Sequence, residues 1–185
     1  MNIYNNKTFC IVGLGLMGGS FARALREFAL CPDARIAAID KDAHIFAIDK
    51  DAGVLARAVE SGVIDDGVLP SDAPSVLGRA DVVIVCLYPA QTSSFLRENA
   101  PFFKRGAIVT DISGVKGALE SIRPALAAAG AFDFISGHPM AGGEKEGFAN
   151  ARANLFQGRN YILIPAPENK PENIAFLKTL IHALG

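Results

Sequence analysis

The sequence predicts an α/β protein of the Rossmann type, with a doubly wound, mostly parallel sheet and helices on both faces. Short apolar runs alternate with helical patterns along the chain, which is typical of successive βαβ units. The runs are continuously apolar, as expected for strands that helices bury on both sides. The first run is followed directly by glycines at positions 13, 15 and 18, the spacing of a turn that binds a dinucleotide.

Each element is predicted from its own pattern. Strands are expected at residues 8–12, 35–40, 81–87 and 107–111, with two shorter ones at 132–135 and 161–164. A helix follows the glycines, because apolar residues recur at offsets of four and seven from Phe21. The last helix begins near Pro171 and carries one apolar face, formed by Ile174, Leu177, Leu180, Ile181 and Leu184.

Composition narrows the classes of protein. The chain has 185 residues, 50% of them hydrophobic, which suits one packed domain over residues 1–185. Its 18 basic and 19 acidic residues give no electrostatic reason to expect nucleic acid or a membrane surface, so the expected partner is a small molecule. The longest apolar run, 82–88, is too short to span a bilayer. Three widely spaced cysteines, Cys10, Cys31 and Cys86, favour neither disulfides nor a metal site, and fit a reducing cytoplasm.

The glycine turn predicts the cofactor class. Gly13 permits a tight turn, Gly15 lets the backbone approach the phosphates, and Gly18 lets the following helix pack closely, with its N–H groups toward the anion. The alternative is an ordinary glycine-rich surface turn. The candidate cofactor-binding residues are the turn and the end of the 81–87 strand: Gly13, Leu14, Gly15, Leu16, Met17, Gly18, Cys86, Leu87 and Tyr88.

A tandem near-repeat complicates the second strand. Residues 34–42 (ARIAAIDKD) are followed at once by 43–51 (AHIFAIDKD). An acidic residue at the end of this strand should accept hydrogen bonds from the ribose hydroxyls and repel a 2′-phosphate, which predicts NAD over NADP. We favour Asp40, at about 20 to 27 residues from the glycines, with the second copy extending the next helix. In the alternative, the second copy is the strand and Asp49 is the carboxylate.

Two further segments carry candidate chemistry. The segment Thr110-Asp-Ile-Ser-Gly-Val-Lys116 lies where a strand ends and a helix begins, the sheet edge at which ligands bind. A cation at a helix start is disfavoured by the helix dipole, so an anion near Lys116 would explain it; the alternative is a lysine that extends to solvent. In Ser136-Gly-His-Pro-Met-Ala-Gly-Gly-Glu-Lys-Glu-Gly147, Pro139 forces His138 into an extended conformation.

His138 is the candidate general base, on an expected glycine-rich loop. An imidazole titrates near neutrality, which suits proton transfer. His44 and His182 lack such a setting and are expected to be scaffold or surface residues.

The segments GLGLMGGS, TDISGVK and above all GHPMAGGEKEG resemble the prephenate and arogenate dehydrogenase family of tyrosine biosynthesis, in its amino-terminal nucleotide-binding domain. The resemblance runs from about Lys7 to the last residue. It implies oxidative decarboxylation of a cyclohexadienol with NAD: hydride leaves the ring carbon that bears the hydroxyl, a histidine takes the hydroxyl proton, and loss of carbon dioxide aromatises the ring. By motif match that histidine is His138. Glu144 matches a glutamate at the active-site entrance, and Lys116 is assigned to the anionic substrate.

One departure concerns Gly114. Many family members read TDxGSxK, with a serine that bonds the histidine and the substrate hydroxyl, whereas here the order is Ser113-Gly114. Either Ser113 substitutes through a backbone adjustment or water fills the gap. Because adjacent residues of an extended segment point opposite ways, the full role does not pass to Ser113.

The family's enzymes continue into a helical domain that makes the dimer and binds substrate. We therefore expect this chain to be the nucleotide-binding part, with residues 171–185 leading to that domain and a homodimer formed through it. The expected activity is a cytoplasmic NAD-dependent prephenate dehydrogenase that yields 4-hydroxyphenylpyruvate. The alternatives are arogenate dehydrogenase, with an amino substrate, and a non-catalytic nucleotide sensor.

Overall fold

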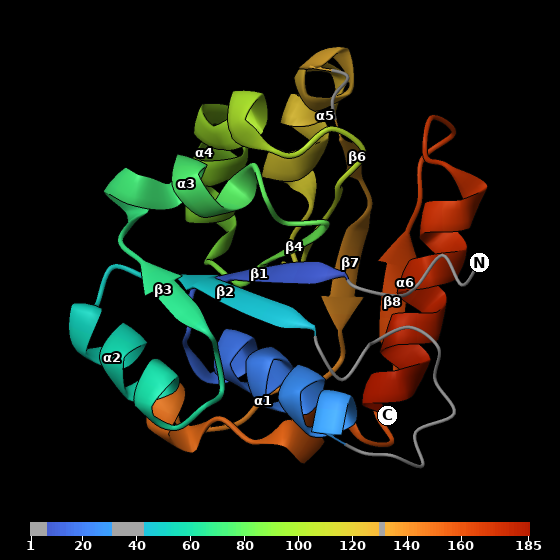
Figure 1. Cartoon of the computed structure of the whole chain (residues 1–185). Helices are drawn as coiled ribbons and strands as arrows, with labels where there is room; N and C mark the ends of the chain where they lie inside the picture. Colours follow the sequence, from blue (N-terminus) through green and yellow to red (C-terminus); the bar gives the residue numbers. More distant parts are fainter. Residues whose placement is uncertain (1–6, 31–42, 130–131) are drawn as a thin grey trace.

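A six-stranded parallel sheet forms the centre of the molecule (Figure 1). The computed structural model describes residues 7–30, 43–129 and 132–185. The strand order is β3-β2-β1-β4-β5-β6, the order of the doubly wound dinucleotide-binding fold. The strands are β1 (Thr8–Val12), β2 (His44–Ile48), β3 (Asp66–Val68), β4 (Val82–Val85), β5 (Ile108–Asp111) and β6 (Asp133–Phe134).

Helices cover both faces of the sheet, as the apolar strands predict. In Figure 1, α1 and α2 lie on one side and α3, α4 and α5 on the other. Along β1, Phe9 and Ile11 pack into one core while Cys10 and Val12 pack into the other. The helices are α1 (Leu16–Leu30), α2 (Ala52–Glu60), α3 (Ala73–Leu77), α4 (Pro89–Asn99), α5 (Gly117–Ala129) and α6 (Pro171–Leu184). None of the helices in the described part of the chain is long and apolar enough to cross a membrane.

The second copy of the repeat forms β2. His44–Ile48 pairs in parallel with β1, and the expected helical extension over this segment is wrong. The expected strand at 35–40 lies outside the described residues. Asp51 ends the second copy as the N-cap of α2, where its carboxylate accepts hydrogen bonds from the N–H groups of Gly53 and Val54. A helix that starts after Asp51 leaves the β-branched and aromatic residues of the second copy for the sheet.

A separate two-stranded ribbon follows β6. Its strands, β7 (Ser136–Pro139) and β8 (Tyr161–Ile164), are antiparallel, with His138 opposite Ile162. Between them lie two short 3₁₀ helices, η3 (Phe148–Asn150) and η4 (Ala153–Phe156), which pack on α1; two others, η1 (Pro70–Asp72) and η2 (Ala100–Phe102), flank α3 and α4. The start of α6 is tied to β6, because the buried Asp133 accepts from the backbone N–H of Lys170 and the amide of Asn173.

Candidate active site

The glycine turn joins β1 to α1 with the geometry that the spacing predicts. Gly13 has a φ of 88°, and a side chain there would meet the carbonyl oxygen of Cys86 at 2.8 Å. A Cβ on Gly18 would overlap the carbonyl oxygen of Gly13. Gly15, in contrast, faces open space. Two glycines therefore close the turn, and the third leaves room for a pyrophosphate at the start of α1, whose first turn contains no acidic residue.

The carboxylate at the end of β2 is Asp49. Its Oδ2 accepts a 2.6 Å hydrogen bond from the N–H of Leu14 in the turn, and its Oδ1 accepts one of 2.9 Å from the N–H of Asp51. Asp40, which the distance from the glycines favours, lies outside the described residues. Asp49 thus has the position that the ribose carboxylate requires, directly after the strand that pairs with β1.

The end of β4 forms the opposite wall of the turn. The N–H of Cys86 donates to the carbonyl of Val12 at 2.7 Å, and the Leu87 side chain lies against Gly13. Burial raises the pKa of the Cys86 thiol, so it is a neutral packing group. Tyr88 precedes α4 and is 68% exposed. All three candidates therefore lie beside or just beyond the turn.

His138 lies within strand β7, not on a loop as expected from the sequence. Its backbone is extended, as Pro139 predicts, and its ring is half-buried. Nδ1 lies 3.5 Å from the carbonyl oxygen of Ile112, on the loop after β5. Because a carbonyl oxygen only accepts hydrogen bonds, this contact favours the tautomer that carries its proton on Nδ1, in which Nε2 is the basic nitrogen.

Gly114 lies against the His138 ring. A Cβ built on Gly114 would be 3.0 Å from Cε1 and 3.4 Å from Nε2. The absence of a side chain at position 114 thus lets the imidazole pack directly against the backbone of this loop. Ser113 is buried, and its hydroxyl has no hydrogen-bond partner among the described residues. Its part in catalysis stays a prediction.

Lys116 does not extend to solvent. Its ammonium donates to Asp111 Oδ2 at 2.8 Å and to the carbonyl of Gly137 at 2.7 Å, and its side chain is 15% exposed. The anion expected near this lysine is therefore a carboxylate of the chain itself. Burial lowers the pKa of Lys116, while the bond to Asp111 acts in the opposite direction.

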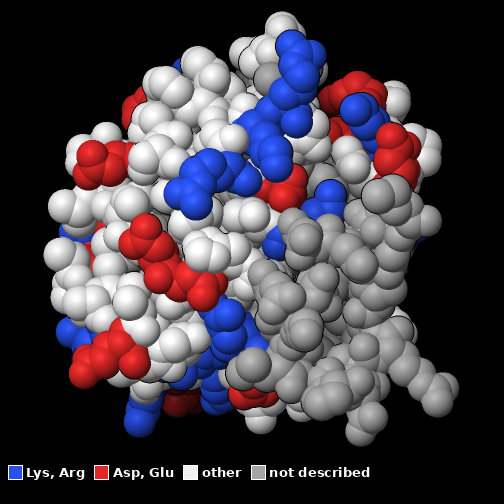
Figure 2. All heavy atoms as spheres, viewed as in Figure 1, with Lys and Arg blue, Asp and Glu red and all other residues white. Residues whose placement is uncertain are grey.

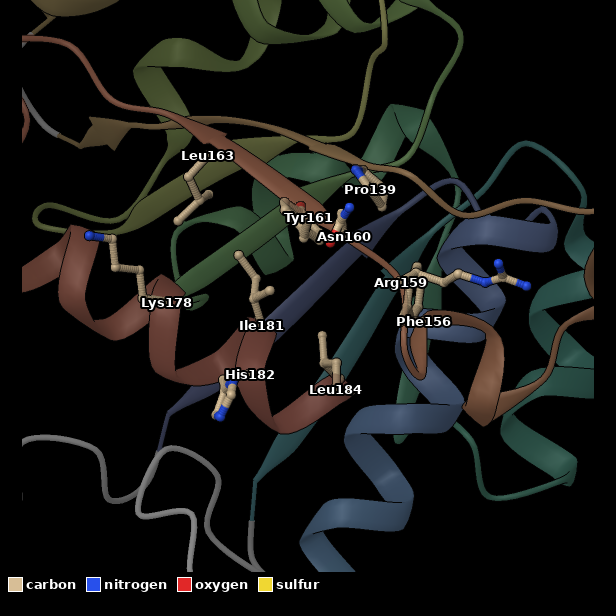
Figure 3. A pocket seen from close by; sticks show the side chains of 11 residues that line it. Pro139, Phe156, Arg159, Asn160, Tyr161, Leu163, Lys178, Ile181, His182 and Leu184 are labelled. Atoms are coloured by element: carbon tan, nitrogen blue, oxygen red, sulfur yellow. The ribbon is translucent and has the colours of Figure 1, made fainter.

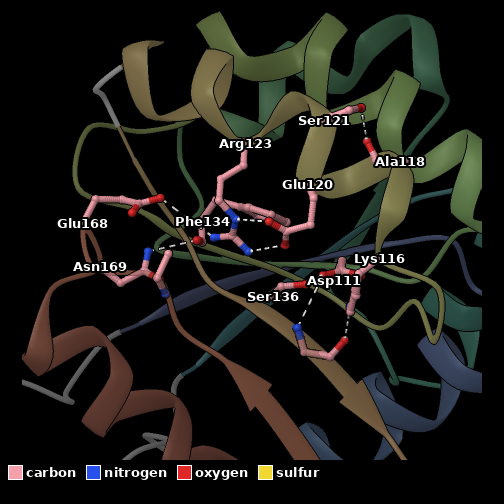
Figure 4. A network of polar contacts seen from close by, with 12 residues as sticks. Asp111, Lys116, Ala118, Glu120, Ser121, Arg123, Phe134, Ser136, Glu168 and Asn169 are labelled. Atoms are coloured by element: carbon pink, nitrogen blue, oxygen red, sulfur yellow. Dashed lines mark hydrogen bonds and ion pairs between the residues drawn. The ribbon is translucent and has the colours of Figure 1, made fainter.

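Asp111 connects the segments of the site (Figure 4), and it was not among the site residues predicted from the sequence. Its carboxylate is fully buried and also accepts from the Ser136 hydroxyl at 2.6 Å and the Ser113 N–H at 2.8 Å. The available signal was an acidic residue at the end of a buried strand, because a carboxylate in a buried position needs several hydrogen-bond donors.

The loop after β7 crosses toward the glycine turn. Gly143 packs near Leu16, at the start of α1, and the Tyr88 hydroxyl lies 3.4 Å from Glu146 Oε1. Glu144 is exposed on this loop. The residue that contacts Tyr88 is thus Glu146, whereas the role expected for Glu144 stays a prediction.

A cavity of about 400 Å³ lies between β8 and α6 (Figure 3). Pro139, Tyr161 and Leu163 line it from the ribbon face opposite His138, because side chains alternate along each strand. Its basic residues, Arg159, Lys178 and His182, point away from one another in Figure 3. The candidate catalytic group therefore does not face this cavity. Over much of the surface shown in Figure 2, acidic and basic side chains are interspersed.

The fold and this site define a dinucleotide-binding domain of a dehydrogenase: a strand-glycine turn-helix, a carboxylate after β2 and an imidazole beyond β5. The chain belongs to the prephenate dehydrogenase family, since residues 23–185 match the family model "Prephenate dehydrogenase, nucleotide-binding domain".

Relatives and solved structures agree with this assignment. The chain is 31% identical to prephenate dehydrogenase of Bacillus subtilis over 182 residues, 94% of this chain and 43% of that protein. It resembles the crystal structure of Aquifex aeolicus prephenate dehydrogenase in complex with hydroxyphenyl propionate and NAD+ (TM-score 0.80, 25% identity, 97% of this chain and 57% of that one). Synechocystis arogenate dehydrogenase is similar (TM-score 0.79, 29% identity, 96% and 57%). The chain spans about half the length of these proteins.

Proposed function

We propose that this chain is the cofactor-binding and proton-accepting part of an NAD-dependent prephenate dehydrogenase. The observation that carries the proposal is the position of His138: its half-buried ring lies against Gly114, on the loop after β5, at the sheet edge that also holds the glycine turn. The family match supports the reaction class, and the similar Aquifex aeolicus enzyme, whose crystal structure is a complex with NAD+, supports the cofactor.

The residues of the turn fit NAD. Gly15 leaves open space for the pyrophosphate at the start of α1, and Asp49 supplies the carboxylate for the ribose hydroxyls. A carboxylate in this place repels the 2′-phosphate of NADP. When bound, NAD accepts the hydride from the ring carbon that bears the hydroxyl group.

His138 holds the proton of this reaction. As the C–H bond breaks, Nε2 takes the hydroxyl proton and a carbonyl forms. Cleavage of the ring–carboxylate bond then releases carbon dioxide, and its electron pair aromatises the ring. The imidazolium can return its proton to the phenolate oxygen, which leaves no net proton on the protein.

The surface beside His138 suits a ring. Val115 follows Gly114 and is 67% exposed, and Met140, two residues after His138, is 54% exposed. Exposed apolar residues of this kind mark binding surfaces when they occur together with polar groups. We also propose that Glu144 acts on the substrate side of this surface.

The test is the formation of reduced nicotinamide by the full gene product with prephenate and NAD, with arogenate and NADP in parallel. We expect turnover with prephenate and NAD. Turnover with arogenate alone would keep the mechanism and change the substrate. Binding of NAD without turnover on either compound would favour a nucleotide sensor.

A further inference from the structure

A buried ion pair joins the end of β5 to the strand that carries His138. The carboxylate of Asp111 has no exposed area, and Lys116 lies 2.8 Å from it with a mostly buried side chain. Burying two charges away from water costs desolvation free energy that a surface ion pair does not, and further hydrogen bonds commonly offset this cost. Here these hydrogen bonds are present. They connect the ion pair to β7, which carries His138, and to the loop after β5, which contacts the imidazole.

The pair joins these segments at both ends. Toward β7, Asp111 Oδ1 accepts from the Ser136 hydroxyl at 2.6 Å, and Lys116 donates to the carbonyl of Gly137 at 2.7 Å. Toward the loop after β5, Asp111 Oδ2 accepts from the Ser113 N–H at 2.8 Å. The residues held are therefore the two that precede His138, and a residue next to Gly114, which faces the ring.

Close packing at Gly137 fixes the position of β7 relative to β5. A Cβ on Gly137 would meet the Tyr161 ring at 2.9 Å and the carbonyl oxygen of Asp111 at 3.0 Å. At Gly137, β7 therefore lies in direct contact with the backbone at the end of β5, and the hydrogen bonds of Asp111 and Lys116 to Ser136 and Gly137 hold β7 in this position.

We infer that Lys116 and Asp111 position His138 for proton transfer, and that Lys116 serves as a positioning residue instead of binding the substrate carboxylates. Two donors of the ammonium are used within the chain, on Asp111 and Gly137. This inference rests on the proposed role of His138 as the base, so its test needs a measurement that is independent of turnover.

The independent measurement is the titration midpoint of His138, because this midpoint responds to the charged groups around the imidazole. The charged groups on the β5 side are Asp111 and Lys116, and residues 144–146 lie on the loop that follows β7. Tyr161, on β8, lies on the other face of the ribbon; its pKa is raised by burial, so it is neutral. Removing one member of the ion pair leaves the other uncompensated beside Ser136 and Gly137, the two residues that precede His138, and the two removals act with opposite sign.

The experiment is a pH titration of the His138 ring resonances by NMR in the 185-residue chain, assigned with the His138→Asn variant. Lys116→Met should move the midpoint to higher pH by about half a unit, because the remaining carboxylate favours the imidazolium. Asp111→Asn should move it to lower pH, because the remaining ammonium disfavours it. Lys104→Met is the matched control: it removes a 2.7 Å pair with Asp81, which lies at the other end of the strands, before β4, and the midpoint should stay unchanged.

Midpoints that stay at the wild-type value in both Lys116→Met and Asp111→Asn would overturn the inference, as would shifts of the same sign. If these variants do not fold, Ser136→Ala, which removes one bond to Asp111, is titrated instead, and a changed His138 midpoint is expected. In the turnover assay, Lys116→Met should lower kcat about tenfold with the Kd for NAD unchanged. A wild type without turnover would argue against the proposed function, while the NMR result would still decide whether the pair acts on His138.

Discussion

The N–H of Leu14 donates a 2.6 Å hydrogen bond to the carboxylate of Asp49, which links the glycine turn to the end of β2. The same turn is linked to β2 by its backbone, because the N–H of Gly13 donates to the carbonyl of Ile48 at 2.7 Å. The carboxylate after β2 and the glycine turn are thus built as one unit, and the aspartate of this unit comes from the second copy of the repeat.

Asp49→Ser should therefore weaken NAD binding about tenfold or more and reduce the preference for NAD over NADP. The reason is the loss of charge-assisted hydrogen bonds to the ribose and of repulsion toward a 2′-phosphate. Calorimetric titration with both nucleotides measures the effect. Asp40→Ser is the control from the first copy of the repeat, and it should bind both nucleotides as the wild type does. A loss confined to Asp40→Ser would reverse the assignment.

Gly15 and Gly18 should respond differently to alanine. Gly15→Ala should fold normally and lose NAD affinity, because the methyl group enters the open space where the phosphates approach. Gly18→Ala should lower the free energy of unfolding by about 2–3 kcal/mol or more, because its methyl group overlaps the Gly13 carbonyl. Urea unfolding and NAD titration of both variants separate the two effects. Equal loss of stability in the two variants would contradict this division.

Much of the fold could be predicted from the sequence. The strands at 8–12 and 161–164, the last helix and the parallel architecture are confirmed, since continuous apolar runs between helical patterns have few other solutions. The short edge strand β3 could not be predicted, because Asp66–Val68 carries no apolar run. The sequence predicts a loop where β7 forms, because the residues of β7 are small or polar and show no strand pattern. They form a strand by pairing with β8, which begins more than twenty residues later in the sequence.

The tandem near-repeat could not be assigned from its own residues and from the distance to the glycines. Both copies offer the same strand and the same terminal aspartate, and distance from the glycines favours the first copy. The choice depends on the segment after each copy: Asp51 is followed by the amphipathic helix that it caps, whereas Asp42 is followed by the second copy itself. In the site, His138 and the glycine turn could be predicted from motifs. The partner of Lys116 was not predicted although Asp111 lies only five residues earlier, because the sequence does not show that the loop between them turns the lysine back onto the buried end of β5.

His138→Asn should lower kcat by about 10²- to 10⁴-fold, because the amide cannot accept the hydroxyl proton at neutral pH. The Kd for NAD should not change, since the glycine turn and Asp49 are untouched. Stopped-flow turnover and nucleotide titration measure the two quantities. His44→Asn and His182→Asn are the controls, and both should retain the wild-type kcat. A normal rate in His138→Asn would remove this residue from the mechanism.

The Asp65 carboxyl group should make the free energy of unfolding depend on pH in the acidic range. Partial burial acts to raise the pKa of this carboxyl, but the Ile45 N–H and the Arg26 guanidinium outweigh burial and hold the pKa below its ordinary value. The carboxylate therefore contributes stability above the unfolded-state pKa of about 4, and this contribution is lost as the pH falls through the lower folded-state pKa.

Asp65→Asn should thus reduce the free energy of unfolding by about 1 kcal/mol near neutral pH, and the difference from wild type should shrink near pH 3. Urea titrations at the two pH values measure it. Asp66→Asn is the neighbouring control, because the Asp66 carboxylate accepts a hydrogen bond from the N–H of the adjacent residue, Gly67, and so does not tie two elements together. A loss in Asp65→Asn that is equally large in acid would contradict the ionic origin.

A substitution at Gly114 should lower kcat without lowering the stability of the fold. Gly114→Ala places a methyl group 3.0 Å from His138 Cε1, so the ring must shift by a few tenths of an ångström, and kcat should fall about three- to tenfold. Gly117→Ala, at the first residue of α5, is the matched control, because a Cβ there meets nothing within 4 Å. Both variants should unfold at the wild-type urea midpoint and bind NAD normally. Equal kcat values in the two variants would show that the close packing of the imidazole against Gly114 does not affect the rate.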